Sequence, residues 1–189
     1  MEYVVLGLGS NRAYKDYSCV ELLIKACTSI HKILTDVRVS SVYRTQAMYV
    51  EDQEDFYNMV VGGFYNGSPL ELLQDIHKIE QSLGRNRQSE IRFGSRSMDI
   101  DIEIFGNLRI KEDDLIIPHE RLTERAFVLA PLLDLFDDCS GERREYFPCI
   151  EGDEVIKYSF FSSKLKELHS QRIEKIIDKE KFLTCVSFG

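Results

Sequence analysis

The sequence predicts an α+β fold of the ferredoxin-like type, in which helices pack on an antiparallel sheet. Two observations lead to this prediction. Segments rich in β-branched and aromatic residues alternate with amphipathic helical segments in the order β-α-β-β-α-β, which is the order of that fold. The chain has 189 residues, of which 43% are hydrophobic and 30% charged, and this suits one compact domain with a sizeable core.

The first half of the chain supplies a strand, a helix and two further strands. Their expected ranges are, in order, 2–8, about 18–34, 37–45 and 56–65. The first strand is an apolar run that ends at the turn Gly9-Ser10-Asn11. In the helix, apolar residues recur at helical spacing from Val20 to Leu34. The later strands are rich in β-branched and aromatic residues, and the acidic loop 46–55 joins them.

A second helix and a strand of unusual pattern follow. Ser68 is an N-cap residue, Pro69 suits the first helical position and Glu71 completes a capping box, so a helix begins here and ends before Gly84. Residues 98–104 alternate strictly between apolar and acidic side chains. They predict a strand with one apolar and one acidic face.

The rest of the chain is less regular. Gly106-Asn107 predicts a turn, and helical spacing of apolar residues predicts a short helix over about 126–133. Residues 137–160 show no clear period, whereas 162–178 predict a lysine-rich amphipathic helix. We divide the chain into a core, 1–136, and a C-terminal extension of the same domain, 137–189. The lysines expected to be solvated in this extension are Lys164, Lys166, Lys175, Lys179 and Lys181.

Composition excludes several classes of protein. Apolar stretches such as Phe127 to Leu133 are far shorter than the ~18–20 residues of a membrane span. The first residues lack the basic stretch of a signal peptide, and the five cysteines form no C-x-x-C pair, so we expect reduced thiols in a cytoplasmic protein. A net charge of −8 argues against binding to nucleic acid. We expect a monomer that acts on small molecules.

The charge is distributed unevenly along the chain. Between Gly84 and Ser97 there are four arginines and one acid, and three acids follow on the predicted strand. The arginines are Arg85, Arg87, Arg92 and Arg96, and the later acids are Asp99, Asp101 and Glu103. Guanidinium groups suit bidentate phosphate binding, and a metal ion with arginines is a recurring way to hold a transferring phosphoryl group. The pattern points to polyphosphate chemistry; the alternative is a basic loop over an acidic face.

The carboxylates are the candidate metal ligands. Asp99 and Asp101 lie two apart on a strand, so their side chains point the same way with roots ~6.5–7 Å apart. Such a pair suits Mg²⁺, which takes a few carboxylates together with waters and phosphate oxygens. The alternative is an ordinary solvated strand face. No P-loop motif occurs, and Gly7-Leu8-Gly9 lacks the third glycine of a dinucleotide-binding fingerprint.

The longest motif places the chain near a known family. Arg92-Phe93-Gly94-Ser95-Arg96-Ser97-Met98-Asp99-Ile100-Asp101, preceded by Gly84-Arg85-x-Arg87, resembles the signature of the 6-hydroxymethyl-7,8-dihydropterin pyrophosphokinases of the folate pathway. The resemblance runs in order from residue 3 to about 135. Further matches are Leu8-Gly9-Ser10-Asn11, Ser41-Val42-Tyr43-Arg44-Thr45, Phe56-x-Asn58, Phe105-Gly106-Asn107, Pro118-His119 and Arg125-x-Phe127.

The resemblance implies transfer of pyrophosphate from ATP, the co-substrate, to the hydroxymethyl group of the pterin, with release of AMP. It implies that Asp99 and Asp101 hold two Mg²⁺ ions on the triphosphate. It also implies that Arg85 and Arg96 act with this pair as catalytic groups by steadying the β- and γ-phosphates. The residues that it assigns to the nucleotide site are Arg87, Arg96, His119 and Arg125.

The resemblance also assigns a pterin site. Thr45 and Asn58 match residues that hydrogen-bond the pterin edge, and Phe56 and Phe127 match the rings that sandwich it. A flat heterocycle does require aromatic faces and a few fixed polar groups at its rim. Without the resemblance, the two phenylalanines would be interpreted as core residues and His119 as an ordinary loop histidine.

Three positions depart from the family pattern, and alternatives remain. Glu103 stands at a usually apolar position, His77 where glutamine is usual, and Asp114 where a basic residue often helps to bind ATP. A metal-dependent phosphohydrolase or nuclease could use the same aspartates but would need Glu103 as a further ligand or base. A noncatalytic ligand sensor or an RNA-binding module could share the fold, although the aromatic RNP1 pattern is absent.

Overall fold

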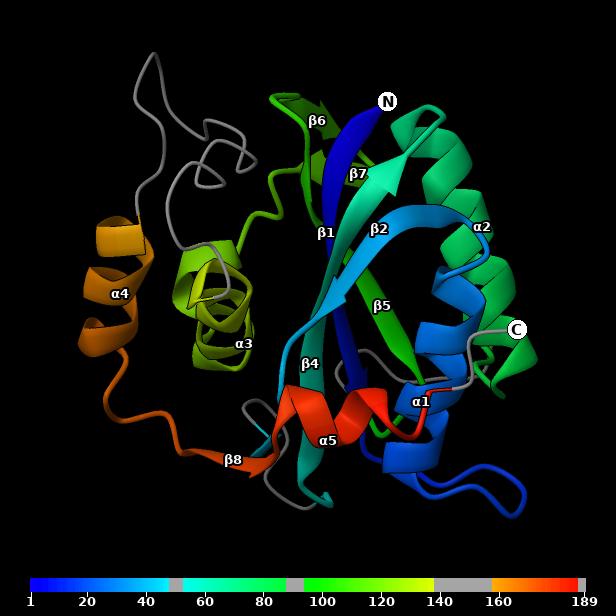
Figure 1. Cartoon of the computed structure of the whole chain (residues 1–189), viewed down its shortest axis with the longest axis vertical. Helices are drawn as coiled ribbons and strands as arrows, with labels where there is room; N and C mark the ends of the chain where they lie inside the picture. Colours follow the sequence, from blue (N-terminus) through cyan, green and yellow to red (C-terminus); the bar gives the residue numbers. More distant parts are fainter. Residues whose placement is uncertain (48–52, 88–93, 138–157, 187–189) are drawn as a thin grey trace.

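The computed structural model describes residues 1–47, 53–87, 94–137 and 158–186 (Figure 1). The strands of the main sheet run in the order β5-β1-β4-β3-β8, and β2 pairs with β4 beside β3; all pairs are antiparallel. These strands are β1 (Glu2–Ser10), β2 (Leu34–Val39), β3 (Val42–Thr45), β4 (Phe56–Tyr65), β5 (Asp99–Phe105) and β8 (Ile173–Ile177). A separate hairpin joins β6 (Ile110–Glu112) to β7 (Leu115–Ile117).

Helices cover both faces of the sheet (Figure 1). The helices are α1 (Cys19–Ile30), α2 (Pro69–Ser82), α3 (Ala126–Asp137), α4 (Tyr158–Glu167) and α5 (Lys179–Leu183), with a 3₁₀ turn, η1, at Leu122–Glu124. Leu23 of α1 and Ile76 of α2 are buried in one core cluster, and Leu129 and Leu132 of α3 in a second cluster on the opposite face. The predicted ferredoxin-like α+β fold is confirmed, with α1 and α2 on one face of the sheet and α3 on the other.

Local sequence explains where these helices begin and end. Ser18 and Ser68 each cap a helix and form the reciprocal capping box with Glu21 and Glu71, as the sequence predicts for the second helix. Gly84 follows α2 with a φ of +90°, a left-handed conformation that suits glycine. None of the helices in the described residues is long and apolar enough to cross a membrane.

Two predicted boundaries in the first half are wrong. The helix expected over 18–34 ends at Ile30, because Leu34 begins β2 and pairs with Tyr65 of β4. The strand expected over 37–45 is divided at Ser40 and Ser41. Both serines are buried: the Ser40 hydroxyl accepts from the Val60 N–H at 2.9 Å, and the Ser41 N–H donates to the Asp134 carboxylate of α3 at 2.9 Å. These bonds hold the chain in a break between β2 and β3.

The helix predicted over 162–178 is also wrong in its second half. The helix α4 ends at Glu167, and residues 173–177 form β8, which pairs with β3 at the sheet edge. Isoleucines at 173, 176 and 177 imitate helical spacing, but the open edge of β3 supplies backbone partners that favour a strand. Phe182 of α5 is buried in the same core cluster as α1 and α2.

Two lysines of the extension are not simply solvated. Lys175 Nζ lies 3.4 Å from the Asp134 carboxylate, and Lys179 Nζ donates to the Asp134 carbonyl at 3.2 Å. Lys164, in contrast, pairs with exposed Glu167 on the surface of α4. Lys175 is exposed, as predicted, although it also contacts Asp134, whereas Lys179 is half-buried against α3. These contacts tie β8 and α5 to α3.

The alternation of side chains between the two faces of β5 is interrupted by a β-bulge. Leu6 of β1 pairs with Ile102, but the next residue, Val5, pairs with Ile104, so Glu103 is extra. Ile100 and Ile102 are buried in the α1–α2 cluster, whereas Ile104 is buried in the α3 cluster. The predicted alternation therefore holds only up to the bulge. The bulge lets Glu103 and Ile104 both lie on the α3 side.

Candidate active site

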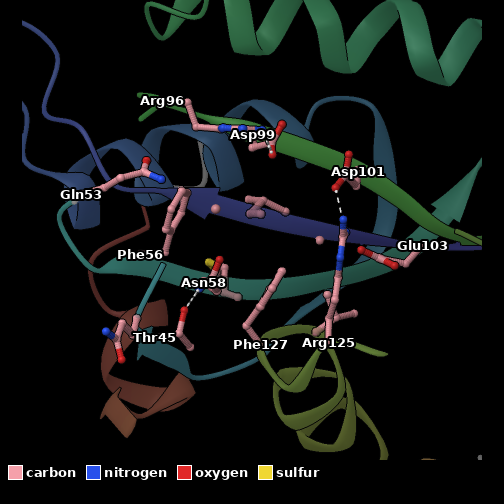
Figure 2. Close-up of a pocket in the computed structure, with 16 residues that line it drawn as sticks. Thr45, Gln53, Phe56, Asn58, Arg96, Asp99, Asp101, Glu103, Arg125 and Phe127 are labelled. Carbon is pink, nitrogen blue, oxygen red and sulfur yellow. Dashed lines mark hydrogen bonds and ion pairs between the residues drawn. The ribbon is translucent and has the colours of Figure 1, made fainter. Parts of the chain in front are cut away.

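One cavity on the α3 side of the sheet gathers eight of the predicted site residues (Figure 2). They are Thr45, Phe56, Asn58, Arg96, Asp99, Asp101, Arg125 and Phe127. They come from β3, β4, β5, the loop before β5 and the start of α3. Three predicted residues, Arg85, Arg87 and His119, are not among the residues that line this cavity.

The glycines Gly7 and Gly9 of β1 leave space for the side chains that line this cavity. A Cβ atom on Gly7 would come within 2.8 Å of the Glu103 Oε1 atom, and one on Gly9 within 2.9 Å of the Asn58 Oδ1 atom. Both glycines line the cavity. The Gly7-Leu8-Gly9 segment is thus a place of close approach between side chains and the sheet, rather than a dinucleotide-binding turn.

Asp99 is held by two arginines. Arg85 Nη1 donates to its Oδ1 atom at 2.8 Å, and Arg96 Nη1 donates to its Oδ2 atom at 2.6 Å. Burial alone would raise the pKa of the Asp99 carboxyl, but the charges of Arg96 and Arg85 outweigh burial and lower it. Asp99 is therefore an ionised carboxylate with both oxygens engaged by cations.

Asp101 faces the cavity more openly than Asp99. Its side chain is 39% exposed, and its Oδ2 atom lies 3.5 Å from Arg125 Nη1. Removal from solvent, together with the neighbouring Asp99 charge, raises the pKa of Asp101 to about 7. Asp101 lines the cavity beside a second carboxylate, an arrangement whose repulsion a cation would relieve.

The two aspartates suit a hard divalent cation that brings other ligands with it. Within the described ranges, no group of three or more histidine, cysteine, aspartate or glutamate residues could hold a metal ion. Asp99 and Asp101 thus supply two carboxylates and no complete cage. Mg²⁺ is bound in this way, through one or two carboxylates with waters and phosphate oxygens.

A buried glutamate that sequence reasoning missed supports the arginines. Glu80 of α2 is 1% exposed; its Oε2 atom accepts from Arg87 Nη2 at 2.6 Å, and its Oε1 atom accepts from the Ile100 N–H at 2.9 Å. Burial raises the pKa of Glu80 against the opposing charge of Arg87. Arg87 remains 48% exposed. Glu80 thus connects the end of α2 to β5 and orients Arg87 beside the cavity.

The Asn11 side chain fixes the loop that carries Arg96. The Asn11 side chain, at the end of β1, accepts from the Arg96 N–H at 2.8 Å and donates to the Glu54 carbonyl at 3.2 Å. Asn11 belongs to a motif that the sequence singled out, but its contact with Arg96 could not be predicted. Arg92 and Phe93 of the long motif lie outside the described residues.

The opposite end of the cavity is aromatic. Phe56 and Phe127 are both half-buried and line the cavity, and Figure 2 shows them with Asn58 between them. Asn58 is buried, and its Nδ2 atom donates to the Thr45 hydroxyl at 2.8 Å. The guanidinium carbon of Arg125 stands 5.5 Å from the centre of the Phe127 ring. This end can hold a flat ring and offer it amide and hydroxyl groups.

His119 and Glu103 meet at the end of β5. The His119 N–H donates to the Glu103 carbonyl at 3.0 Å, and its Nδ1 atom accepts from the Arg121 N–H at 3.1 Å. Burial and the charge of Arg125 lower the pKa of His119 to about 4. His119 is therefore neutral at pH 7 and accepts, rather than donates, at Nδ1.

Glu103 is an unexpected acid in the cavity wall. It is 1% exposed, and its Oε2 atom has no hydrogen-bond partner among the described residues. Burial, with the nearby Asp101 charge, raises the pKa of Glu103 to about 8. Figure 2 shows it beside Arg125. The other departures do not line this cavity: His77 lies on α2, and Asp114 is exposed in the β6–β7 turn.

Comparisons with known proteins find a family that matches most of this chain. The family model described as 7,8-dihydro-6-hydroxymethylpterin-pyrophosphokinase (HPPK) matches residues 5–137. The chain is 44% identical over 112 residues to the 2-amino-4-hydroxy-6-hydroxymethyldihydropteridine pyrophosphokinase of Bacillus subtilis (strain 168), covering 59% of this chain and 66% of that protein. It is 40% identical over 139 residues to a folate synthesis bifunctional protein of Arabidopsis thaliana, covering 71% of this chain.

The matched segment spans only 27% of that Arabidopsis protein. Among solved structures, the fold is similar to the one described as "Crystal Structure Analysis of the HPPK-DHPS in complex with substrates", with a TM-score of 0.65. That likeness covers 89% of this chain and 44% of the other. At 16% sequence identity, it concerns the fold alone.

Proposed function

The chain belongs to the 7,8-dihydro-6-hydroxymethylpterin-pyrophosphokinase family, and we propose that it carries out this step of folate biosynthesis. In this reaction ATP gives its β,γ-pyrophosphoryl group to the hydroxymethyl oxygen of 6-hydroxymethyl-7,8-dihydropterin. The oxygen of the pterin bonds to the β-phosphorus, the hydroxyl proton is released, and the bond from that phosphorus to the α–β bridging oxygen breaks. AMP leaves with the bridging oxygen.

The observation that carries this proposal is a cavity with two chemically different ends. One end holds Asp99 and Asp101 with arginines, and the other holds two phenylalanines around a buried Thr45–Asn58 pair. A polyphosphate suits the first end and a flat heterocycle the second. Because both lie in one cavity, a pterin hydroxyl can meet a triphosphate there.

The charged end would bind and neutralise the triphosphate. Asp99 and Asp101 would hold Mg²⁺, which when bound supplies positive charge against the negative charge that develops during phosphoryl transfer. We propose two such ions, as the family pattern implies. Arg85 and Arg96 already stand against Asp99, at 2.8 and 2.6 Å, so a phosphate next to that carboxylate lies within reach of both.

The remaining cationic residues would orient the nucleotide. Arg125 stands between Asp101 and the Phe127 ring, at the junction of the two ends of the cavity. Arg87 is held by Glu80 at the exposed side, where a sugar or base could lie. His119, neutral and half-buried, would act as a hydrogen-bonding group rather than as a cation.

The aromatic end would select the pterin. Phe56 and Phe127 would stack on its two faces, each stack contributing ~0.5–1.5 kcal/mol beyond area burial. The Asn58 amide and Thr45 hydroxyl would pair with its polar rim, and their mutual 2.8 Å bond fixes both in position. A ring lacking that rim would leave the remaining donors and acceptors of these two buried groups without partners, which disfavours its binding.

We further propose a cytoplasmic monomer. One copy of the chain supplies every predicted site residue that lines the cavity, which supports a site formed within a single copy. Cys19, Cys27 and Cys185 are free thiols, as a reducing compartment allows. The phosphohydrolase alternative requires Glu103 as a further metal ligand or as a base, and the buried Glu103, whose pKa of about 8 keeps it protonated at pH 7, suits neither role.

The proposal is tested by the identity of the nucleotide product. Purified protein is incubated with ATP and Mg²⁺, with and without the dihydropterin, and the nucleotides are separated by chromatography. We expect AMP, formed only when the pterin is present. ADP as the product, or AMP formed at the same rate without the pterin, would overturn the assignment.

A further inference from the structure

A glutamine of the C-terminal extension bonds to the backbone on both sides of Arg125. The Gln171 Nε2 atom donates to the Glu124 carbonyl at 2.9 Å, and the Ala126 N–H donates to the Gln171 Oε1 atom at 2.8 Å. A single side-chain amide thus spans the peptide segment that carries Arg125. Gln171 lies in the connection between α4 and β8, beyond the residues 5–137 that the family model matches.

The backbone groups that Gln171 binds lack helical partners. Glu124 ends the turn η1 and Ala126 begins α3, so the first N–H groups of α3 and the last carbonyls of η1 face outward. Arg125 between them has an extended backbone, with φ −119° and ψ 106°. The Gln171 amide supplies the missing donor and acceptor and joins the two helical turns.

Arg125, within this segment, and Phe127, just after it, both line the cavity. Arg125 Nη1 lies 3.5 Å from the Asp101 carboxylate, and the Arg125 side chain is only 12% exposed. Phe127, on the first turn of α3, lies under the Arg125 guanidinium. Because the Arg125 backbone sets the direction of its own side chain and of the first turn of α3, the Gln171 bonds constrain both.

The position of Gln171 is itself fixed. Its N–H donates to the Leu168 carbonyl at 2.9 Å, and β8, two residues later, pairs with β3, where Thr45 opposes Ile173. Lys175 and Lys179 tie the same extension to Asp134 of α3. The Gln171 amide is therefore anchored to the strand that carries Thr45 and to the helix that carries Phe127.

We propose that Gln171 is a positioning residue for both substrates. It holds Arg125 for the triphosphate and Phe127 for the pterin without touching either ligand. The proposal rests on the proposed function for the roles of Arg125 and Phe127. It gives the extension a part in substrate binding, beyond its support of the sheet.

Three variants separate this role from general support of the fold. Gln171→Met keeps the length of the side chain but removes both hydrogen bonds. Gln171→Glu keeps the acceptor for the Ala126 N–H but has no donor for the Glu124 carbonyl. Lys164→Met is the matched control. It removes a polar contact within the same extension, the ion pair with exposed Glu167, and this pair does not involve the Arg125 segment.

The first measurement is amide hydrogen exchange at Ala126, which does not require catalysis. We expect exchange about 10-fold faster in Gln171→Met than in the wild type, as the loss of a ~1.4 kcal/mol constraint implies. Gln171→Glu should retain the protection of Ala126, and Lys164→Met should not change it. Equal exchange in the wild type and Gln171→Met would overturn the proposal, even if the protein proves to make no AMP.

The second measurement is steady-state kinetics with ATP and the dihydropterin. Gln171→Met should raise the KM for both substrates and lower kcat/KM by about 10- to 100-fold, as expected for misplaced binding groups. Gln171→Glu should lie between Gln171→Met and the wild type. Unchanged KM values in a folded Gln171→Met would contradict the proposal. Failure of the wild type itself to form AMP would contradict the proposed function instead.

Discussion

Arg96 Nη1 donates a hydrogen bond of 2.6 Å to the Oδ2 atom of Asp99, three residues along the chain. A residue expected to bind phosphate is therefore held by a residue expected to bind metal. Arg85 holds the other oxygen of the same carboxylate. Metal site and phosphate site are thus a single charge network centred on Asp99, and changes at Asp99 affect both.

The first prediction concerns turnover. Asp99→Ala and Asp101→Ala should each lower kcat for AMP formation by at least ~10²-fold, the usual cost of losing one electrostatic stabiliser of a transition state. Arg96→Ala should cost a comparable or larger factor. Initial rates at saturating ATP, Mg²⁺ and pterin test this. A loss below tenfold in either aspartate variant would show that the carboxylate pair is not the metal site.

The second prediction separates the two aspartates by stability. Asp99→Ala leaves two largely buried guanidinium groups without their shared carboxylate, which should lower the free energy of unfolding by about 3 kcal/mol. Asp101→Ala removes a 39% exposed carboxylate and should change it by less than about 1 kcal/mol. Urea unfolding without metal measures both. Equal losses in the two variants would contradict the network centred on Asp99.

The third prediction concerns the aromatic end. Phe127→Leu keeps apolar bulk against the α3 cluster but loses the ring, so the dissociation constant for the pterin should rise about tenfold. ATP binding should barely change. Phe64→Leu is the matched control, because Phe64 packs on the same cluster but does not line the cavity. An unfolded Phe127→Leu, or the same loss of pterin affinity in Phe64→Leu, would favour a core role for Phe127.

The fourth prediction follows from the buried Glu103. Its pKa of about 8 lies above the ordinary value of 4.5, so the folded protein keeps a proton that the unfolded chain loses above pH 4.5. The stabilising effect of this proton is fully present below pH 4.5 and is lost as the pH rises to about 8. Relative to Glu103→Gln, the wild type should therefore lose stability between pH 5 and 8.

The slope of that loss should approach about 1.4 kcal/mol per pH unit. Chemical unfolding of both proteins at about pH 5, 6.5, 8 and 9.5, in metal-free buffer, gives the difference at each pH. We expect the advantage of Glu103→Gln to grow with pH and to level off above 8. A difference that stays constant over this range would mean that Glu103 is ionised in the folded protein.

Patterns local in sequence predicted most of the fold. Ser68 and Glu71 form a capping box from neighbouring residues alone, and β4 spans the predicted 56–65 because its composition leaves no competing structure. Elements that depend on distant partners were predicted poorly. The strand β8 exists because the edge of β3 is open, and the hairpin of β6 and β7, at 110–117, is too short for its period to be recognised.

The site shows the same division. Asp99, Asp101 and the arginines could be recognised because a short motif carries them, and the cavity does bring most of them together. Glu80 and Gln171 could not, because they act through contacts with Arg87 and with the backbone beside Arg125, the latter 45 residues away. A glutamine in a segment without a motif carries no sequence pattern that indicates its backbone partners.

The bulge in β5 determines how the length of this strand can vary. Leu6 faces Ile102 and Val5 faces Ile104, so Glu103 is the residue of β5 without a counterpart of its own. Deleting Glu103 would join residues 99–102 to 104–105, and both segments already pair with β1. Each side chain in them would keep the face of the sheet on which it now lies. A deletion nearer the start of the strand would instead turn Asp99 toward the helices α1 and α2. We therefore expect the fold to tolerate a deletion at Glu103, whereas a deletion at Asp101 should disrupt the carboxylate pair.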